Sequence, residues 1–398
     1  MARRVYLHVG SPKTGTTFLQ EVLWSQKELA KEQGLLLPLE AFFDHYLATL
    51  AVRDIEPQPQ DVERAAGVWG RIVEASHEWD GDVLVSHELF APATAEQAER
   101  AIAAFGPDAE VHLVLTVRDL VRQIPAEWQE HVKHRSTSDF GAFVADLRRE
   151  DPTTWFWQVQ DFRDVLRRWG STIPASRVHV VSVPPAGQPS SLLWERFAGL
   201  LGLDPSTFTT TGLRANTSLG YEQAELLRRV NAELGDRLPL PGPYAPDVKS
   251  MFAERVLPQQ PGTKLALAGD GLDYAVKRSE QLAQQIAGLG VDVVGGLDEL
   301  VPDRAALGDP APLETPGDDV LLAESLTALT GVLEEYSTLR RRANRERQET
   351  ERLRQLESEM RERPFKHLLR GLSERWGWAG KARSAARRAR DRVRSLRR

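Results

Sequence analysis

The chain contains no cysteine among its 398 residues. That absence excludes disulfide bonds, zinc sites built on thiolates, iron–sulfur clusters and a cysteine nucleophile. No apolar run reaches the length of about 18 residues that a membrane-spanning helix needs. The first ten residues have a basic tip but only a short apolar stretch, which predicts a β-strand rather than a signal peptide. We therefore expect a cytoplasmic protein.

Lysine is scarce as well, because only 9 of the 51 basic residues are lysine and the others are arginine. The basic charge is also unevenly placed. Residues 361–398 hold 14 Lys and Arg against 3 Asp and Glu, so this tail carries +11 and the rest of the chain −17. Two interpretations stay open: a tail that meets an anionic surface such as the inner face of a membrane, or a solvated arginine-rich segment. Nothing in the tail predicts base-specific binding to nucleic acid.

Hydrophobic residues make up 41% of the chain, which is enough for a sizeable core. The first 220 residues alternate strand-like and helix-like segments. Strands are predicted at 4–9, 35–37, 83–86, 111–117 and 177–183, and helices at 16–33, 62–79, 95–105, 155–169 and 194–201. Such alternation predicts an α/β fold of three layers, with a mostly parallel sheet and helices on both faces.

The remaining third of the chain is predicted to be helical, with joints rich in proline and glycine. We expect residues 1–301 to form the α/β domain with a helical C-terminal part, and 302–319 to be a linker. An amphipathic helix at 320–362 and the basic tail at 363–398 would follow. Leu322, Leu326, Leu329, Leu333 and Tyr336 are spaced by four and three residues, a seam through which two copies of the chain could pair.

The turn after the first predicted strand carries the clearest motif. It runs from Gly10 through Ser-Pro-Lys-Thr to Gly15 and then opens a helix, so its backbone N–H groups can surround one anion. The glycines have the spacing of a P-loop, but the position after Gly15 is Thr16 and the lysine stands inside the loop, at Lys13. A nucleoside triphosphatase also needs a carboxylate for Mg²⁺, and no apolar strand here ends in a plain Asp.

Two other strands end in groups that can do chemistry. The strand at 83–86 is followed by His87 and Glu88, and the strand at 111–117 by Arg118. The carboxyl ends of parallel strands meet at one edge of the sheet, so these groups are expected near Lys13. His87 and Glu88 face opposite sides if the strand continues, so one of them is expected to reach the site. His45, after the second strand, is a third candidate base.

The loop motif resembles the 5′-phosphosulfate loop of sulfotransferases that use PAPS (3′-phosphoadenosine 5′-phosphosulfate), and the chain is most similar to bacterial, actinobacterial-type members. The motifs cover about residues 4–220. The resemblance implies a P-loop-like fold and transfer of a sulfuryl group from PAPS, without a metal, to a hydroxyl group of a carbohydrate or small molecule.

The resemblance also implies roles for individual residues. Lys13 lies against the oxygen that bridges phosphate and sulfate, and His87, Glu88 or His45 acts as base. The loop residues that hold the phosphosulfate are Ser11, Pro12, Lys13, Thr14, Gly15, Thr16 and Thr17. Arg118 binds the 3′-phosphate, but the family's serine eight residues later is Ala126 here. Either Lys133, Ser136 or Ser138 replaces the missing donor, or the cofactor is held less tightly. Lys249 matches a late basic contact, and Asn216 and Ser218 a loop near the acceptor or the 3′-phosphate.

Two other functions remain open at this stage. One is a P-loop enzyme of the kinase type, which would use ATP and Mg²⁺. The other is a non-catalytic protein with a vestigial cofactor fold that binds a membrane or a partner through its C-terminal helix and basic tail.

Overall fold

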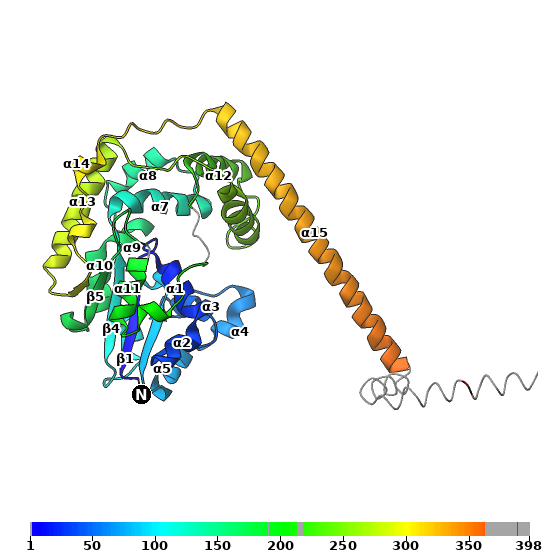
Figure 1. Ribbon diagram of the computed structural model, residues 1–398, viewed down its shortest axis with the longest axis horizontal. Coiled ribbons are helices and arrows are strands. Elements are labelled where there is room, and N and C mark those ends of the chain that lie inside the picture. The colour runs from blue at the N-terminus through cyan, green and yellow to red at the C-terminus, as the bar shows by residue number, and fades with distance from the viewer. Residues whose placement is uncertain (1, 190, 213–217, 363–387, 389–398) are drawn as a thin grey trace, which may run out of the picture. The chain divides into compact units, whose positions relative to one another are not determined.

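The computed structural model describes residues 2–189, 191–212, 218–362 and 388. Within them, six strands form one sheet in which every neighbouring pair is parallel (Figure 1). The order is β2-β3-β1-β4-β5-β6. The strands are β1 (Arg4–His8), β2 (Leu35–Leu36), β3 (Asp82–Ser86), β4 (Val111–Val117), β5 (Val178–Ser182) and β6 (Asp292–Val294). The predicted α/β class is confirmed, and β1 lies between β3 and β4, whose ends carry the candidate site residues.

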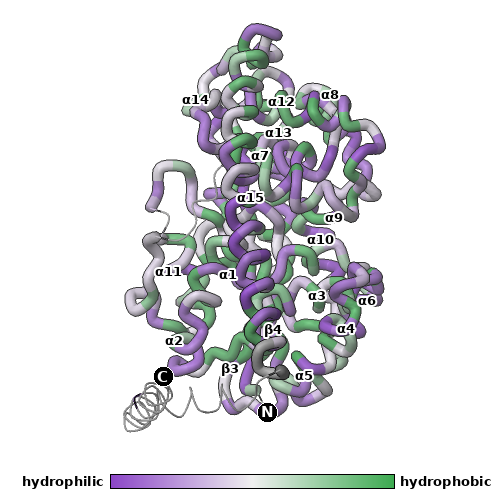
Figure 2. Tube along the Cα trace, turned by 90° about the vertical axis from the view of Figure 1, so that its right-hand side faces the viewer, coloured by the Kyte–Doolittle hydropathy of each residue, from purple (hydrophilic) through white to green (hydrophobic). Residues whose placement is uncertain are grey.

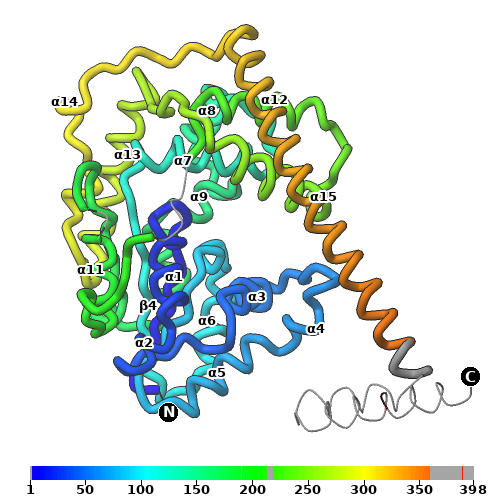
Figure 3. The backbone as a smooth tube through the Cα atoms, turned by 45° about the vertical axis from the view of Figure 1, so that its right-hand side comes forward, coloured from blue at the N-terminus to red at the C-terminus, as the bar shows by residue number. Residues whose placement is uncertain are grey.

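One face of the sheet is covered by α1 (Thr16–Ser25), α2 (Lys27–Glu32) and α11 (Ser191–Leu200). Figure 3 shows α11 beside α1, although α1 ends at Ser25 and α11 begins only at Ser191. Leu19 and Val22 of α1 and Phe197 of α11 share one buried cluster with Tyr6 and Val114 of the sheet. This buried cluster packs α1, which follows the first βα turn, against the sheet.

The opposite face is covered by α5 (Val68–Glu78), α6 (Ala95–Ala103) and α10 (Phe162–Gly170). Aromatic rings join these elements edge to face. The ring centroid of Phe90 lies 5.9 Å from that of Trp69 in α5 and 5.8 Å from that of Trp169 in α10. Two further helices, α3 (Phe42–Val52) and α4 (Val62–Ala65), pack outside this layer. The sheet is therefore buried on both faces, which explains why its strands read as continuous apolar runs.

A helical layer lies beyond the edge where β1, β3 and β4 end (Figure 1). It includes α7 (Leu120–Lys133), α8 (Phe140–Leu147), α9 (Trp155–Gln160), α12 (Tyr221–Leu234), α13 (Gly269–Ala287) and the π-helical segment η5 (Ala245–Val256). Helix α7 contacts α8, α12, α13 and η5. Short 3₁₀ turns occupy Pro59–Asp61, Glu88–Phe90, Ala175–Arg177, Pro205–Thr207, Leu257–Gln259 and Asp298–Leu300.

Three helices that the sequence predicts as continuous are each broken in two. The breaks fall at Gln26, at Ala66–Gly67 and at Asp161. Gly67 has a φ of 64°, a conformation that ends one helix and opens the next at little cost only for glycine. Asp161 caps α10 by accepting a hydrogen bond from the backbone of Asp164, which lets the chain change direction there. Helix α3 and strand β6 were not predicted.

The chain divides into two compact units, Met1–Leu326 and Thr327–Arg398. Helix α15 runs over Asp318–Glu362, and the segment predicted as a linker contains one short helix, α14 (Arg304–Leu307). Figure 2 shows the second half of α15 as strongly hydrophilic, while Leu329, Leu333 and Tyr336 are exposed. Among the described helices, none combines the length and hydrophobicity needed to span a bilayer. The basic tail lies outside the described residues apart from Arg388, so pairing through the helix and membrane contact through the tail stay predictions.

Candidate active site

The loop between β1 and α1 is fastened to β4 through Thr116. The backbone of Thr116 donates to Gly10 O (2.7 Å) and accepts from Ser11 N (3.0 Å), and its hydroxyl lies 2.5 Å from that of Thr14. Gly15 has a φ of 89° and stands at the N-terminus of α1 without a side-chain cap. The first N–H groups of α1 therefore remain available to an anion, with the positive end of the helix dipole behind them.

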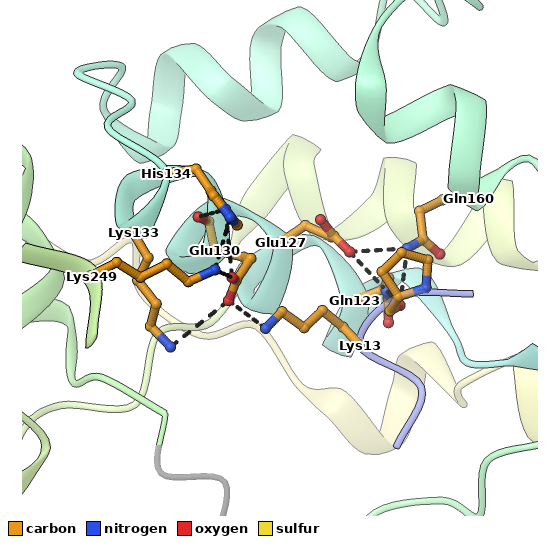
Figure 4. A network of polar contacts seen from close by, with 9 residues as sticks. Lys13, Gln123, Glu127, Glu130, Lys133, His134, Gln160 and Lys249 are labelled. Atoms are coloured by element: carbon orange, nitrogen blue, oxygen red, sulfur yellow. Dashed lines mark hydrogen bonds and ion pairs between the residues drawn. The ribbon is translucent and has the colours of Figure 1, made fainter. Parts of the chain in front are cut away.

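The opposite side of the loop is fastened to the helical layer. The side-chain amides of Gln123 in α7 and Gln160 in α9 both donate to the carbonyl oxygen of Pro12, at 2.6 and 3.1 Å (Figure 4). Gln160 also donates to the carboxyl group of Glu127 at 3.0 Å. Burial raises the pKa of Glu127 to about 7, against the opposing effect of Lys13. At neutral pH this carboxyl group is partly protonated, so it adds less than a full negative charge to the site.

A cavity of about 1100 Å³ lies above the loop and the strand ends. It brings together residues that follow β1, β3 and β4 with others that the sequence predicts for the site. Those on its wall are Pro12, Lys13, Gly15, Thr16, Thr17, Glu88, Arg118, Ala126, Ser218 and Lys249. Two predicted loop residues, Ser11 and Thr14, are fully buried beneath the wall and are not among the lining residues. Thr14 shapes the loop by donating to Ser11 O.

Arg118 is a cation without a counter-ion in the part of the chain that the structure describes. Its Nε donates to Gln123 Oε1 (2.8 Å) and its Nη2 to Arg122 O (3.2 Å). Burial lowers the pKa of Arg118 to about 10, and the neighbouring charge of Arg122 adds to this effect. A desolvated guanidinium on a cavity wall gains most from an anionic ligand, since the ligand supplies the missing negative charge.

Only one of the three candidate bases reaches the cavity. Glu88 lines it, and its Oε2 is buried with no hydrogen-bond partner among the described residues. His87 is 6% exposed, stacks on Phe42 with ring centroids 5.3 Å apart, and accepts a hydrogen bond from Leu89 N at Nδ1 (3.1 Å). Burial lowers the pKa of His87, and its ring is not part of the cavity wall.

His45 is held inside the fold. Its Nε2 lies 3.1 Å from the carbonyl oxygen of Pro38 and its Nδ1 accepts from Ser86 N at 3.2 Å, so both ring nitrogens are engaged with the backbone. Burial lowers the pKa of His45 to about 4. These two contacts fix one neutral tautomer of the ring. They join α3 to β3 and leave no ring nitrogen free for a substrate.

Four polar groups surround the carboxylate of Glu130 on the cavity wall (Figure 4). Lys13 Nζ lies 2.5 Å from Oε2, Lys249 Nζ 3.0 Å from Oε1 and Lys133 Nζ 3.9 Å from Oε2. His134 Nδ1 lies 3.5 Å from Oε1. The three lysines, with Lys13 first, hold the pKa of Glu130 far below its usual range even though burial acts in the opposite direction.

Of the three positions expected to replace the missing serine hydroxyl at Ala126, two line the cavity and one does not. Lys133 and Ser136 line the same cavity as Ala126. Ser138 is not among the lining residues, and its carbonyl oxygen accepts a hydrogen bond from the indole of Trp128 (3.0 Å). Asn216 lies outside the described residues.

Sequence reasoning missed a stripe of polar residues along α7. Gln123, Glu127, Glu130 and His134 are separated by four, three and four residues, so they share one face of the helix and its C-terminal cap. All four belong to the network that joins the loop to the helical layer (Figure 4). Their helical spacing next to Arg118 is a signal in the sequence that could have identified them.

No model of a known protein family matches the chain, and no curated protein matches its sequence. Among solved structures, the chain is similar to a sulfotransferase from Alicyclobacillus acidocaldarius. The alignment covers 54% of this chain and 87% of the other, with 15% identity and a TM-score of 0.35. At this TM-score the likeness assigns neither an activity nor a ligand.

Proposed function

We propose that the chain is a sulfotransferase that moves a sulfuryl group from PAPS to a hydroxyl group of a carbohydrate or small molecule. One observation carries the proposal: Lys13, Arg118 and Glu88 line a single cavity at the N-terminus of α1, which has no side-chain cap. Transfer of an anionic group to a hydroxyl requires cationic groups that hold the donor and a base that takes the hydroxyl proton. The cavity offers cationic groups at two places and one such base.

The charge of the cavity wall supports an anionic donor. Five cationic side chains stand on it against three carboxyl groups, of which Glu127 is partly protonated at neutral pH. The cationic residues are Lys13, Arg118, Lys133, Arg135 and Lys249, in a chain whose overall charge is −6. PAPS carries negative charge at both of its phosphate-bearing positions, so the loop with Lys13 and the more distant Arg118 offer one cationic centre for each.

When bound, PAPS would supply an activated sulfuryl group and a leaving group, 3′,5′-ADP. The chain's own part in the reaction is mainly electrostatic. Lys13 and the N–H groups of residues 15–17 are assigned to the oxygen that bridges sulfur and phosphorus, where negative charge grows in the transition state. Glu88 is assigned the role of general base, because it is the one candidate base on the cavity wall, where its carboxyl group can accept the proton that the acceptor hydroxyl loses. Lys249 and Ser218, on the same wall, are proposed as donor or acceptor contacts.

The first experiment is calorimetric titration of the full chain with 3′,5′-ADP and, separately, with ATP in the presence and absence of Mg²⁺. We expect 3′,5′-ADP to bind without a metal and more tightly than ATP. Tighter binding of ATP that depends on Mg²⁺ would favour a kinase-like enzyme instead. Binding of 3′,5′-ADP with no turnover of labelled PAPS on any hydroxyl acceptor would favour a non-catalytic protein.

The second experiment measures transfer from ³⁵S-labelled PAPS across a panel of hydroxyl acceptors. Lys13→Ala is expected to lower kcat by about 10²–10³-fold, since it removes charge stabilisation in the transition state. Affinity for 3′,5′-ADP should change far less, because that product lacks the sulfuryl group. The exposed Lys264 provides a matched control, and Lys264→Ala should keep the wild-type rate. An unchanged rate for Lys13→Ala contradicts the assignment.

A further inference from the structure

Glu130 places a negative charge inside a site built for anions, and the sulfotransferase proposal gives it no task. Its carboxylate contacts Lys13, the cation assigned to the reacting group, and also Lys133 and Lys249. These are three of only nine lysines in the chain, and all three line the cavity. An ion cluster that served stability alone would not need to stand on a cavity wall.

The cluster is accessible to a ligand as well as internally paired. The side chain of Glu130 is 19% exposed and those of Lys13 and Lys249 are 27% and 24% exposed. Lys13 has a φ of 61°, a left-handed conformation that is uncommon for residues other than glycine, and it lies on the cavity wall. A ligand at the loop therefore meets the same ammonium groups that hold Glu130.

The charges of the cluster do not cancel. Three ammonium groups and one carboxylate leave two positive charges. Burial and the neighbouring Lys249 lower the pKa of His134, which disfavours a further positive charge on its ring. Without Glu130 the cluster would carry three. The carboxylate therefore sets how much negative charge the reacting end of a ligand can bring.

Distance makes this effect large. An oxygen that accepts a hydrogen bond from Lys13 Nζ lies about 3 Å from that nitrogen. Glu130 Oε2 lies 2.5 Å from it on another side, so the two anionic oxygens are neighbours across one ammonium group. Each additional negative charge on the ligand's terminal group then repels Glu130 directly.

We infer that Glu130 is a specificity-determining residue, which lowers the affinity of the loop for a doubly charged phosphoryl group relative to a singly charged sulfuryl group. The inference rests on the proposed function. It explains how a loop with the glycine spacing of a P-loop can disfavour a terminal phosphoryl group. Glu130 acts through Lys13 and takes no part in the transfer itself.

The test compares two ligands that differ at the terminal group alone: PAPS and 3′-phosphoadenosine 5′-diphosphate. Calorimetric titration at pH 8 keeps the terminal phosphoryl group doubly charged. Glu130→Gln keeps the shape of the side chain and removes a negative charge that repels the terminal group. It should shift the ratio of the two affinities toward the diphosphate by about 10-fold, mainly by tightening the diphosphate.

Two further variants complete the design. Glu130→Asp keeps the charge and should keep the ratio near the wild-type value, whereas Glu63→Gln removes an exposed carboxylate outside the cavity wall and should leave the ratio unchanged. An unchanged ratio in a folded Glu130→Gln variant overturns the inference and leaves the sulfotransferase proposal standing. If that variant does not fold, Glu130→Ala is measured in its place. Failure of the wild-type protein to bind either ligand overturns both.

Discussion

Two arginines four residues apart should respond to the same substitution in opposite ways. Arg118 lines the cavity and forms no ion pair among the described residues, and burial lowers its pKa to about 10. Arg122 pairs with Asp119, a carboxylate that is only 4% exposed, and donates to Pro184 O at 2.8 Å. The first arginine is placed for a ligand and the second for the fold.

The pKa of Arg118 gives the size of the first effect. A shift of this size means that the fold disfavours the charged side chain by about 3 kcal/mol relative to water. Arg118→Met removes that cost, along with two hydrogen bonds worth about 1 kcal/mol each. We therefore expect the free energy of unfolding to stay within about 1 kcal/mol of the wild-type value or to rise. Affinity for 3′,5′-ADP should fall about 100-fold, the effect of losing two charge-assisted hydrogen bonds.

The matched variant Arg122→Met should behave in the reverse manner. It leaves the carboxylate of Asp119 buried without its partner, so the free energy of unfolding should fall by about 3 kcal/mol. Binding of 3′,5′-ADP by the folded fraction should be unchanged. Urea denaturation and calorimetric titration measure the two quantities. The reasoning is refuted if Arg118→Met destabilises the protein as Arg122→Met does and binds 3′,5′-ADP like the wild type.

Two other predictions concern the candidate bases and the buried histidines. Glu88→Gln should lower kcat for transfer from labelled PAPS by about 10²–10⁴-fold, whereas His87→Asn should keep kcat within about tenfold; the reverse pattern would return the role of base to His87. Burial lowers the pKa of His8 to about 3 and that of His45 to about 4, from 6.5. As the pH falls below 6.5 the unfolded chain takes up protons that the folded chain does not, so the two groups leave stability unaffected above pH 6.5 and reduce it by up to ~2.7 kcal/mol per pH unit below it. Urea midpoints that stay constant from pH 7.5 to pH 5 would show that these rings are not held neutral.

The strand ends could be predicted from the sequence because they follow a general rule of parallel sheets. Apolar runs fixed where β1, β3 and β4 lie, and the residues after them had to meet at one edge, which brought Lys13, Glu88 and Arg118 to one cavity. The breaks within helices were harder to predict. At Gln26 and Asp161 no proline or glycine marks the change of direction, and tertiary packing decides it.

The choice between His87 and Glu88 could not be made from the sequence. It depends on the residue at which β3 ends and a 3₁₀ turn begins, and boundaries of this kind are set by local hydrogen bonds such as that from Leu89 N to His87. The role of Glu130 was hidden for another reason. Its place on one face of α7 can be read from the sequence, but the contact with Lys13 joins residues 117 positions apart.

The anchoring of the loop on two sides has a consequence for how quickly and how tightly an anion can bind. Thr116 joins one side to the sheet, and the carbonyl oxygen of Pro12 joins the other to α7 and α9. A backbone already held in this way gives up little conformational entropy when an anion arrives, because its N–H groups are in position beforehand. Most of the entropy cost of binding is then the ligand's own loss of freedom. The association rate is not limited by a rearrangement of the loop.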